Sequence, residues 1–509
     1  MSLAQNSVRK NMLKLYKFVA QVCLVSLFAL GTGCPLKGQN AAKTNDEPSI
    51  PQTPIGKLLI AFLDAVNSQD QMRIDAFVAS SFSKKKVVKD AWPTPCCAPA
   101  IVSRTLFNVA RRSNGLTLKE VHPLENEIVA FVQTKNSGRR VYIDLKNTAG
   151  SPSQIESYQL IPVPPDLGEF LPQVPASTPL AERLELARQA LNKAASRDLF
   201  SGTLLVARKS KVLLSASFGD ADKDLHLVNS LNTPFGLAST GKLFTSVAVA
   251  QLVSQGKLSY DEPIIRYLPD YPNKAVASKI TLRQLLTHTS GLADIFSEEN
   301  PKFPLRRLSD YYPQFANNPL LFEPGKGQSY SNTGFLVPSM IVEQASGQEF
   351  KHYLREHIFK PAGMNNTGWG HPKRMAHPYT KDNTDDPLNP DSPWVNADPF
   401  YKDLLAGPAA GPGGEYSTVE DLLKFSTALQ DGQLLDSKEF NRLIQEGYGC
   451  QCSATPGHRI YAHPGGGPGV NSGLKLYVDQ NFVAIFLSNY DPPFPQMLAS
   501  SIGDLLVEP

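Results

Sequence analysis

The stretch from residue 235 to residue 256 constrains the fold most, because it contains an apolar helix with a polar pair at its start. Its apolar side chains recur at helical spacing, at Leu243, Val247, Val249 and Leu252. Gly256 supplies a helix stop. We therefore expect a buried helix that begins near Ser239 and ends near Gly256.

Ser239 and Lys242 are three residues apart, so both side chains lie on one face of the first helical turn. A hydroxyl beside an amine that can take its proton is a nucleophile with its base. The helix N-terminus also favours negative charge near Ser239. Ser-x-x-Lys alone is a weak signal, since it also begins at Ser7, Ser81, Ser83, Ser254 and Ser472.

Two later motifs strengthen the interpretation. Tyr330-Ser-Asn332 places a phenol and an amide two residues apart on a turn or strand-like loop, which directs both to one side. His463-Pro-Gly465 is the only His-x-Gly in the chain, and its glycines let backbone approach a ligand. His288, in contrast, is expected to be a structural histidine that hydrogen-bonds backbone.

Several local patterns lead to further expectations. The irregular segment 366–412 is either a pocket rim or a surface insertion. Ser417, with Glu420 three residues later, is typical of a helix N-cap. Strands are expected around residues 473–478 and 483–487, and a C-terminal helix over 495–506.

A chain of 509 residues is too long for one compact core, so two or three domains are expected. Its hydrophobic content of 41% and charged content of 19% are ordinary for a globular protein. The net charge of +3 is too small and too evenly spread to indicate nucleic-acid binding.

Residues 1–34 have the pattern of a signal peptide, with a basic region followed by an apolar run from Phe18 to Leu30. The alternative is a retained anchor helix. Residues 30–34 resemble a bacterial lipoprotein signal, in which Cys34 would be lipidated. The match is imperfect, because Gly31 stands where a large aliphatic residue is usual. The alternative is ordinary cleavage of the signal peptide without lipid attachment. We expect export to a bacterial periplasm or envelope, a mitochondrial location being the alternative. Residues 35–50 are expected to form a flexible tether.

Four cysteines follow the signal segment, as Cys96-Cys97 and Cys450-x-Cys452. They allow three pairings, which the sequence does not decide between, and a link between the two clusters would tie two domains together. Their spacing is not that of a metal site, and no metal or cofactor is expected.

Residues 51–161 are expected to form a small α+β domain. Helices are expected over 55–66 and 72–79, and strands over 128–132, 141–145 and 155–161. The domain resembles the nuclear-transport-factor-2-like (NTF2-like) domains attached to some hydrolases, and we expect a spacer or a partner-docking module. A Pro-rich linker, 162–179, separates it from a domain over 180–509, which opens with a helix over 180–199 and strands over 202–207 and 211–218.

With Ser239-x-x-Lys242, Tyr330-x-Asn332 and His463-x-Gly465 in this order, residues 180–509 resemble the serine β-lactamase and penicillin-binding-protein superfamily. Two phrases add support, the run from Thr281 to Gly291 and the run from Gly413 to Thr418. The closest branch is the class C β-lactamase-related hydrolases, which includes D-alanyl-D-alanine carboxypeptidases, D-aminopeptidases and esterases. The resemblance implies an α+β fold with an antiparallel sheet flanked by helices beside a helical subdomain.

The resemblance also implies roles. Ser239 would be the nucleophile, Lys242 its base and Tyr330 the relay of the proton to the leaving group. Asn332 would hold the acyl side chain of the substrate. The backbone N–H groups of Ser239 and Gly466 would form the oxyanion hole.

One departure concerns the substrate. The third motif of β-lactamases and carboxypeptidases usually begins with a lysine that favours a substrate carboxylate, whereas His463 is charged only part of the time near neutral pH. We therefore expect hydrolysis of a small-molecule or peptide ester or amide. The alternatives are a β-lactamase or D-Ala-D-Ala carboxypeptidase, and a non-catalytic cell-wall or ligand-binding protein.

Overall fold

The computed structural model describes residues 48–82, 99–124, 126–148, 151–295, 305–381, 389, 392–399, 401 and 411–507. The expected signal peptide, most of the tether, Cys34, Cys96 and Cys97 lie outside these residues. The chain divides into two compact units, one formed by residues up to Pro165 with Lys381–Val395, the other by Asp166–Thr380 with Asn396–Pro509. Each unit is described by itself.

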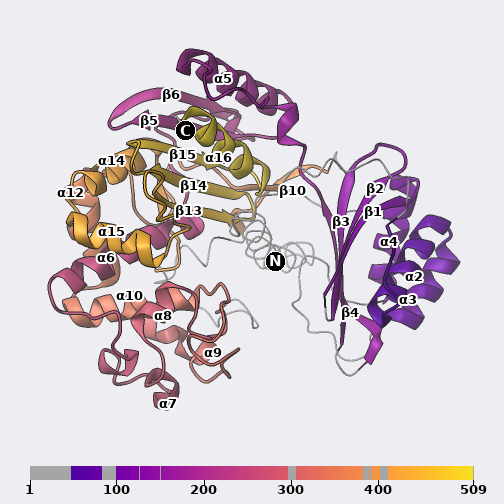
Figure 1. The fold of residues 1–509 in the computed structure, drawn as a ribbon, viewed down its shortest axis with the longest axis horizontal. Coiled ribbons are helices and arrows are strands. Elements are labelled where there is room, and N and C mark those ends of the chain that lie inside the picture. Colours follow the sequence, from indigo (N-terminus) through magenta and orange to yellow (C-terminus); the bar gives the residue numbers. More distant parts are fainter. Residues whose placement is uncertain are drawn as a thin grey trace. The chain divides into compact units, whose positions relative to one another are not determined.

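The first unit packs three helices on one face of a four-stranded antiparallel sheet (Figure 1). The sheet has the order β1-β2-β3-β4, and β2 alternates buried and half-buried residues because one of its faces meets the helices. The elements are α2 (Pro54–Ser68), α3 (Gln71–Ser81), α4 (Pro99–Ser113), β1 (Leu116–Pro123), β2 (Glu127–Thr134), β3 (Arg140–Thr148) and β4 (Ser151–Pro162).

The sequence predicted two of these helices and three of these strands, and it missed α4 and β1. Strand β1 is an edge strand whose residues are mostly exposed, so it lacks the apolar alternation that marks a half-buried strand. The likeness to NTF2-like domains stays a prediction.

The second unit is built on a five-stranded antiparallel sheet of order β13-β14-β15-β5-β6 (Figure 1). The strands are β5 (Gly202–Arg208), β6 (Lys211–Phe218), β13 (Ile460–Gly467), β14 (Val470–Tyr477) and β15 (Phe482–Ser488). Leu204 and Val206 join a core with α5 (Leu180–Ser196) and α16 (Phe494–Leu506), whereas Leu205 and Ala207 join a second core on the opposite face. Burial on both faces explains why β5 is a continuous apolar run.

The second core contains the helical part of this unit. Helix α6 is at its centre, and ten of its thirteen residues are buried, which agrees with the apolar helix expected from the sequence. The main helices here are α6 (Lys242–Ser254), α8 (Leu282–Leu286), α10 (Thr333–Ser346), α11 (Phe350–Leu354), α14 (Val419–Gln430) and α15 (Ser437–Glu446). The short helices are α7 (Lys274–Ala277), α9 (Tyr312–Phe315) and α12 (Lys360–Ala362). An antiparallel sheet flanked by helices, with a helical part beside it, is the α+β architecture predicted.

The shortest strands form two-stranded pairs outside the main sheet. They are β7 (Asp220–Asp222) with β8 (Leu227–Val228), β9 (Phe235–Gly236) with β12 (Tyr416–Ser417), and β10 (Tyr379–Lys381) with β11 (Trp394–Asn396). No helix among the described residues combines the length and apolarity that a membrane span requires.

The motif at His463 precedes the expected strand, which is β14, and it also forms a strand that was not expected, β13, paired along its length with β14. One local expectation was wrong. Helix α14 is capped by Thr418, whose side chain accepts from the N–H of Asp421, and not by Ser417. Among the pairings that the sequence left open, the structure joins Cys450 to Cys452 in a disulfide.

Candidate active site

Ser239 lies in the 3-10 turn η2 (Ala238–Gly241), directly before α6. The residue before it, Ala238, has a φ of 43°, a left-handed conformation that costs a residue with a Cβ about 1 kcal/mol or more. The turn is held against the sheet, since Thr240 Oγ1 donates to the carbonyl of His463 at 3.2 Å. Tertiary contacts therefore impose the backbone geometry that presents Ser239.

Ser239 Oγ lies between the two side chains predicted to move its proton. Lys242 Nζ is 3.0 Å from Ser239 Oγ, and the hydroxyl of Tyr330 is 2.6 Å from the same oxygen. Tyr330 comes from the loop before α10, 91 residues further along the chain. The structure thus brings the first two motifs into one hydrogen-bonded row.

Lys242 is fully buried, and three hydrogen bonds orient its amine. Besides Ser239, Nζ contacts Asn332 Oδ1 at 2.9 Å and the carbonyl of Pro412 at 2.8 Å. All three acceptors are uncharged. The predicted substrate-binding residue Asn332 therefore lies behind Ser239, against the amine.

Asp294 fixes the orientation of Asn332. Its Oδ2 accepts from the backbone N–H of Asn332 at 2.7 Å and from Nδ2 at 3.0 Å. The amide is assigned with Oδ1 toward Lys242 by this network of donors and acceptors. Sequence reasoning missed Asp294, because a single aspartate in a loop has no distinguishing spacing.

His288 supports Tyr330, as expected of a structural histidine. Its Nδ1 accepts from the backbone N–H of Ser331 at 3.1 Å, and its ring stacks on Tyr330 with centroids 4.7 Å apart. Burial, and then the proximity of Lys242, lowers the pKa of His288 to about 3. A neutral ring is what accepting a backbone N–H at Nδ1 requires.

His463, on the edge strand β13, is 5% exposed, and its Nδ1–H donates to the carbonyl of Pro464 at 2.5 Å. Burial, and then Lys242, lowers the pKa of His463 to about 3. The ring is therefore neutral near neutral pH, whereas the sequence led us to expect partial protonation. It offers no positive charge for a substrate carboxylate.

Gly465 lets β13 approach the turn that carries Ser239. A Cβ at this position would lie 2.1 Å from the carbonyl oxygen of Leu237 and 3.0 Å from the N atom of Thr240, so a side chain does not fit. Gly466, the next residue, is half-buried in an otherwise mostly buried strand. Because β13 is at the edge of the five-stranded sheet, some of its N–H groups have no partner strand. The oxyanion-hole role of Ser239 and Gly466 stays a prediction.

A buried carboxyl group, which the sequence did not indicate, lies behind the turn. Glu415 is 1% exposed, and a Cβ added to Gly241 would lie 2.1 Å from its Oε2. Burial raises the pKa of Glu415 to about 7, and the charges of Lys351 and Lys242 offset only part of that effect. The side chain thus titrates near neutral pH beside the residue that links Ser239 to Lys242.

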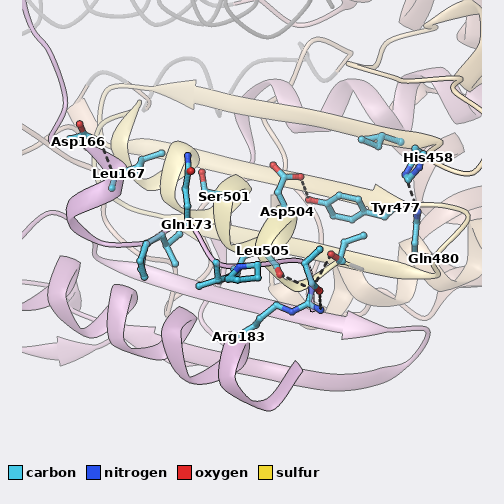
Figure 2. Close-up of a pocket in the computed structure, with 18 residues that line it drawn as sticks. Asp166, Leu167, Gln173, Arg183, His458, Tyr477, Gln480, Ser501, Asp504 and Leu505 are labelled. Atoms are coloured by element: carbon cyan, nitrogen blue, oxygen red, sulfur yellow. Dashed lines mark hydrogen bonds between the residues drawn. The ribbon is translucent and has the colours of Figure 1, made fainter. Parts of the chain in front are cut away.

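The second unit also has a cavity of about 760 Å³ that none of the predicted site residues lines (Figure 2). Arg183 of α5 and Asp504 of α16 are among its lining residues, together with Tyr477 at the end of β14. Arg183 donates to the carbonyl of Thr178 at 2.7 Å, and Asp504 accepts from the hydroxyl of Tyr477 at 2.7 Å. Both charged groups have partners within the protein.

The comparisons with known proteins agree with this geometry. Residues 185–506 match the Beta-lactamase family model. Penicillin-binding protein 4* of Bacillus subtilis is 31% identical over 315 residues, which cover 57% of this chain and 68% of that protein. The putative penicillin-binding protein PbpX of the same organism is 30% identical over 302 residues, covering 57% and 71%.

Solved structures show the same fold. A penicillin-binding protein from Bacillus halodurans matches with a TM-score of 0.53 at 29% identity, covering 65% of this chain and 99% of that one. The D-amino acid amidase from Ochrobactrum anthropi SV3, complexed with L-phenylalanine amide, matches with a TM-score of 0.54 at 24% identity, covering 65% and 97%. The β-lactamase-like fold is therefore confirmed, and the chain belongs to the Beta-lactamase family of serine hydrolases.

Proposed function

We propose that this protein hydrolyses an ester or amide through an acyl-enzyme on Ser239. The observation that carries the proposal is the hydrogen-bonded row in which Lys242 Nζ and Tyr330 OH lie 3.0 Å and 2.6 Å from Ser239 Oγ. A nucleophile within hydrogen-bond reach of a base, with that base oriented by further groups, is the arrangement that covalent catalysis requires.

In the proposed acylation step, Ser239 Oγ bonds to the substrate carbonyl carbon while its proton passes to Lys242 Nζ. The bond from carbon to the leaving oxygen or nitrogen breaks, Tyr330 OH delivers its proton to the leaving group, and the proton on Lys242 Nζ passes to the Tyr330 phenolate. Water then attacks the acyl ester, one of its protons passes through the same side chains to Ser239 Oγ, and the acid is released. The N–H groups of Ser239 and Gly466 are proposed to hold the oxyanion, and one such donor contributes about 10²–10³-fold in rate.

The neutral ring of His463 favours substrates that lack a carboxylate at the position where a β-lactam or D-Ala-D-Ala tail carries one. We therefore place ester or amide hydrolysis ahead of β-lactam hydrolysis. Acylation by penicillin is the second candidate, because both Bacillus subtilis relatives are named as penicillin-binding proteins. A binding protein without turnover is the third.

We further propose that the chain is exported, from the signal pattern of residues 1–34, with Cys34 as a site of lipid attachment. Accessory roles for residues 51–161, as a spacer or a docking module, are part of the same proposal. Deleting these residues tests the docking role. If the localisation of the protein and its binding to partners stay unchanged, residues 51–161 are not a docking module.

The decisive experiment measures pre-steady-state hydrolysis of p-nitrophenyl butyrate by the wild type and by Ser239→Ala. The matched control is Ser254→Ala, because Ser254 begins another Ser-x-x-Lys at the exposed end of the same helix. In the wild type and in the control we expect a burst of one equivalent of p-nitrophenolate per protein chain. In Ser239→Ala we expect no burst. Full activity of Ser239→Ala would overturn the proposal.

Two further measurements separate the candidates. A chromogenic cephalosporin measured beside the ester distinguishes β-lactamase activity from esterase activity. If neither substrate turns over, mass spectrometry after incubation with a labelled penicillin decides between slow acylation, which adds mass at Ser239, and binding without chemistry, which adds none.

A further inference from the structure

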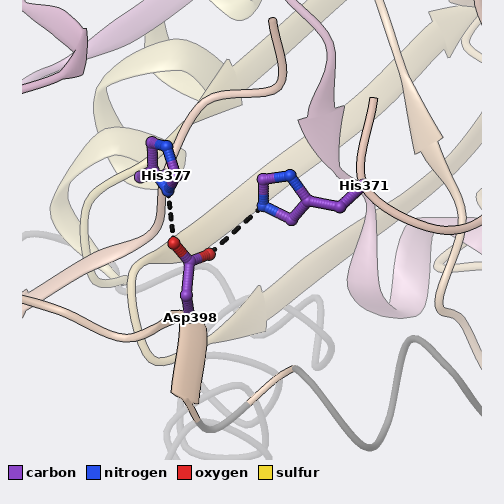
Figure 3. Close-up of side chains that lie close together, drawn as sticks. All are labelled: His371, His377 and Asp398. Carbon is purple, nitrogen blue, oxygen red and sulfur yellow. Dashed lines mark hydrogen bonds and ion pairs between the residues drawn. The ribbon is translucent and has the colours of Figure 1, made fainter. Parts of the chain in front are cut away.

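Two histidines and an aspartate meet outside the Ser239 site (Figure 3). His371, His377 and Asp398 each offer one ligand atom, and these atoms all lie within 4.8 Å of one another. His371 Nε2 is 3.3 Å from Asp398 Oδ1, and His377 Nδ1 contacts the other oxygen, Oδ2. All three belong to the second unit. Figure 3 shows both rings directed at the one carboxylate.

A second carboxylate orients His377 from its other side. Asp222 Oδ2 lies 3.5 Å from His377 Nε2, whereas Nδ1 faces Asp398. Asp222 is itself held in place, because its Oδ1 accepts from the N–H groups of Asp224 and Leu225 at 2.9 and 3.0 Å. Once a metal takes the place of the proton on Nδ1, a carboxylate at Nε2 holds the remaining ring proton there, the usual support of a metal-ligating histidine.

We propose that His371, His377 and Asp398 bind one Zn²⁺ ion, with Asp222 as the carboxylate that orients His377. Imidazole nitrogens and a carboxylate oxygen are ligands that zinc accepts, at about 2.0–2.2 Å. Bonds of that length in a tetrahedron place ligand atoms about 3.3 Å apart, which is the separation of His371 Nε2 and Asp398 Oδ1.

Charge and exposure fit a bound cation with water in its remaining position. Asp398 and Asp222 offset a dication with two neutral imidazoles. The side chains are 39% exposed for His371, 29% for His377 and 28% for Asp398, so the ion can enter from solvent and keep a water ligand.

The backbone around these residues is anchored to the sheet side of the unit. The N–H of His377 donates to the carbonyl of Ala221 at 2.8 Å, and its carbonyl accepts from Asn489 Nδ2 at 3.0 Å. The N–H of Ala376 donates to the carbonyl of Pro234 at 2.9 Å, directly before the strand β9 that leads to Ser239. Zinc would thus join His371 and His377 to Asp398 and stabilise the backbone at Ala376 and His377 that is hydrogen-bonded to Pro234 and Ala221.

The sequence did not predict this site, because its ligands are 6 and 21 residues apart and lie in an irregular stretch. The competing explanation is a metal-free ion pair, in which Asp398 simply accepts from two imidazoles. The two explanations differ in what Zn²⁺ does to the folded protein.

The test uses the full chain without a polyhistidine tag, first treated with a chelator and then titrated with Zn²⁺ by calorimetry. We expect one ion per chain at micromolar or tighter affinity, and a rise in Tm of about 5 °C at saturating Zn²⁺. Mg²⁺ should produce neither effect, because it prefers oxygen ligands.

Variants localise the binding. His371→Ala removes an exposed ring and should abolish stoichiometric binding while the Tm without metal stays that of the wild type. Asp222→Asn should weaken binding about 10–100-fold. His352→Ala, at an exposed histidine of α11, is the matched control and should bind as the wild type does. Absence of stoichiometric binding at 100 µM Zn²⁺, or equal binding by His371→Ala, would overturn the proposal.

Discussion

Asp294 holds Asn332 through a single oxygen, since Oδ2 accepts both the backbone N–H of Asn332 at 2.7 Å and its Nδ2 at 3.0 Å. This leaves Oδ1 of the amide directed at Lys242 Nζ, 2.9 Å away. A carboxylate that no sequence motif marks therefore positions the amine proposed to take the proton of Ser239.

Replacing Asp294 by alanine should misplace Asn332 and so Lys242. We expect kcat/KM for the ester to fall about 100-fold, mostly in kcat, because a small displacement of a reacting group has an effect of that size. Asp431→Ala, at an exposed aspartate after α14, is the control. If Asp294 acts through Asn332, adding Asn332→Ala to Asp294→Ala lowers the burst rate little further; additive effects would contradict this coupling.

Removing the hydroxyl of Tyr330 should affect chemistry far more than stability. Tyr330→Phe keeps the ring that stacks on His288 and loses the oxygen 2.6 Å from Ser239 Oγ. We expect kcat to fall about 10²–10⁴-fold and the free energy of unfolding to change by about 1 kcal/mol or less. Tyr267→Phe, which removes a hydroxyl bonded to the backbone N–H of Ser259, should leave kcat unchanged. Equal kcat values in Tyr330→Phe and the wild type would exclude the relay.

The sequence predicted the elements that periodicity and motif order can reveal. The apolar helix after Ser239 follows from its spacing, and the structure brings Ser239, Lys242, Tyr330 and Asn332 together, as the resemblance to the superfamily implied. Helices such as α2 and strands such as β3 have the periodicity of one buried face.

The remaining features depend on tertiary contacts. The glycines of β13 give it no strand propensity, and it forms a strand because it pairs with β14 and packs on the turn of Ser239. Asp294 acts on Asn332, which is 38 positions away in the sequence, and Glu415 owes its properties to burial. A local sequence pattern contains neither kind of information. The cluster around Asp398 is assembled in the same way.

Acid should destabilise the folded protein through its buried histidines. The folded-state pKa of His463 is about 3, below the value of 6.5 for an exposed ring, so the unfolded chain binds more protons between these values. Stability is then fully present above pH 6.5 and is lost as pH falls toward 3. Between pH 6.5 and pH 5 the loss is about 2 kcal/mol for this residue, and His288 acts in the same direction.

Urea unfolding at pH 7, 6 and 5 measures this dependence. His463→Gln has no proton to gain in this range, so its free energy of unfolding should fall less steeply with acidification than that of the wild type. Parallel slopes for the two proteins would contradict the assignment of a neutral, buried ring to His463.

Glu415 should have the opposite effect on stability, which it lowers as the pH rises. Burial raises its folded-state pKa to about 7 from a usual value of 4.5, so the folded state binds more protons between these values. Stability is therefore lost as pH rises through this window, by up to about 3 kcal/mol. The glutamine of Glu415→Gln stays neutral, so the variant should match the wild type at pH 4.5 and exceed its free energy of unfolding at pH 8.

The same substitution tests whether Glu415 assists Lys242. A neutral side chain beside Gly241 adds no negative charge that would hold the amine as an ammonium, so Glu415→Gln should retain the ester burst at pH 8, where an ionised carboxylate in the wild type favours the ammonium. Well below pH 7 both side chains are neutral, and the two proteins should give the same burst. Urea unfolding and burst amplitude, both measured from pH 4.5 to pH 8, separate the two effects. A variant that loses stability above pH 7 in parallel with the wild type would show that Glu415 is already ionised in the folded protein.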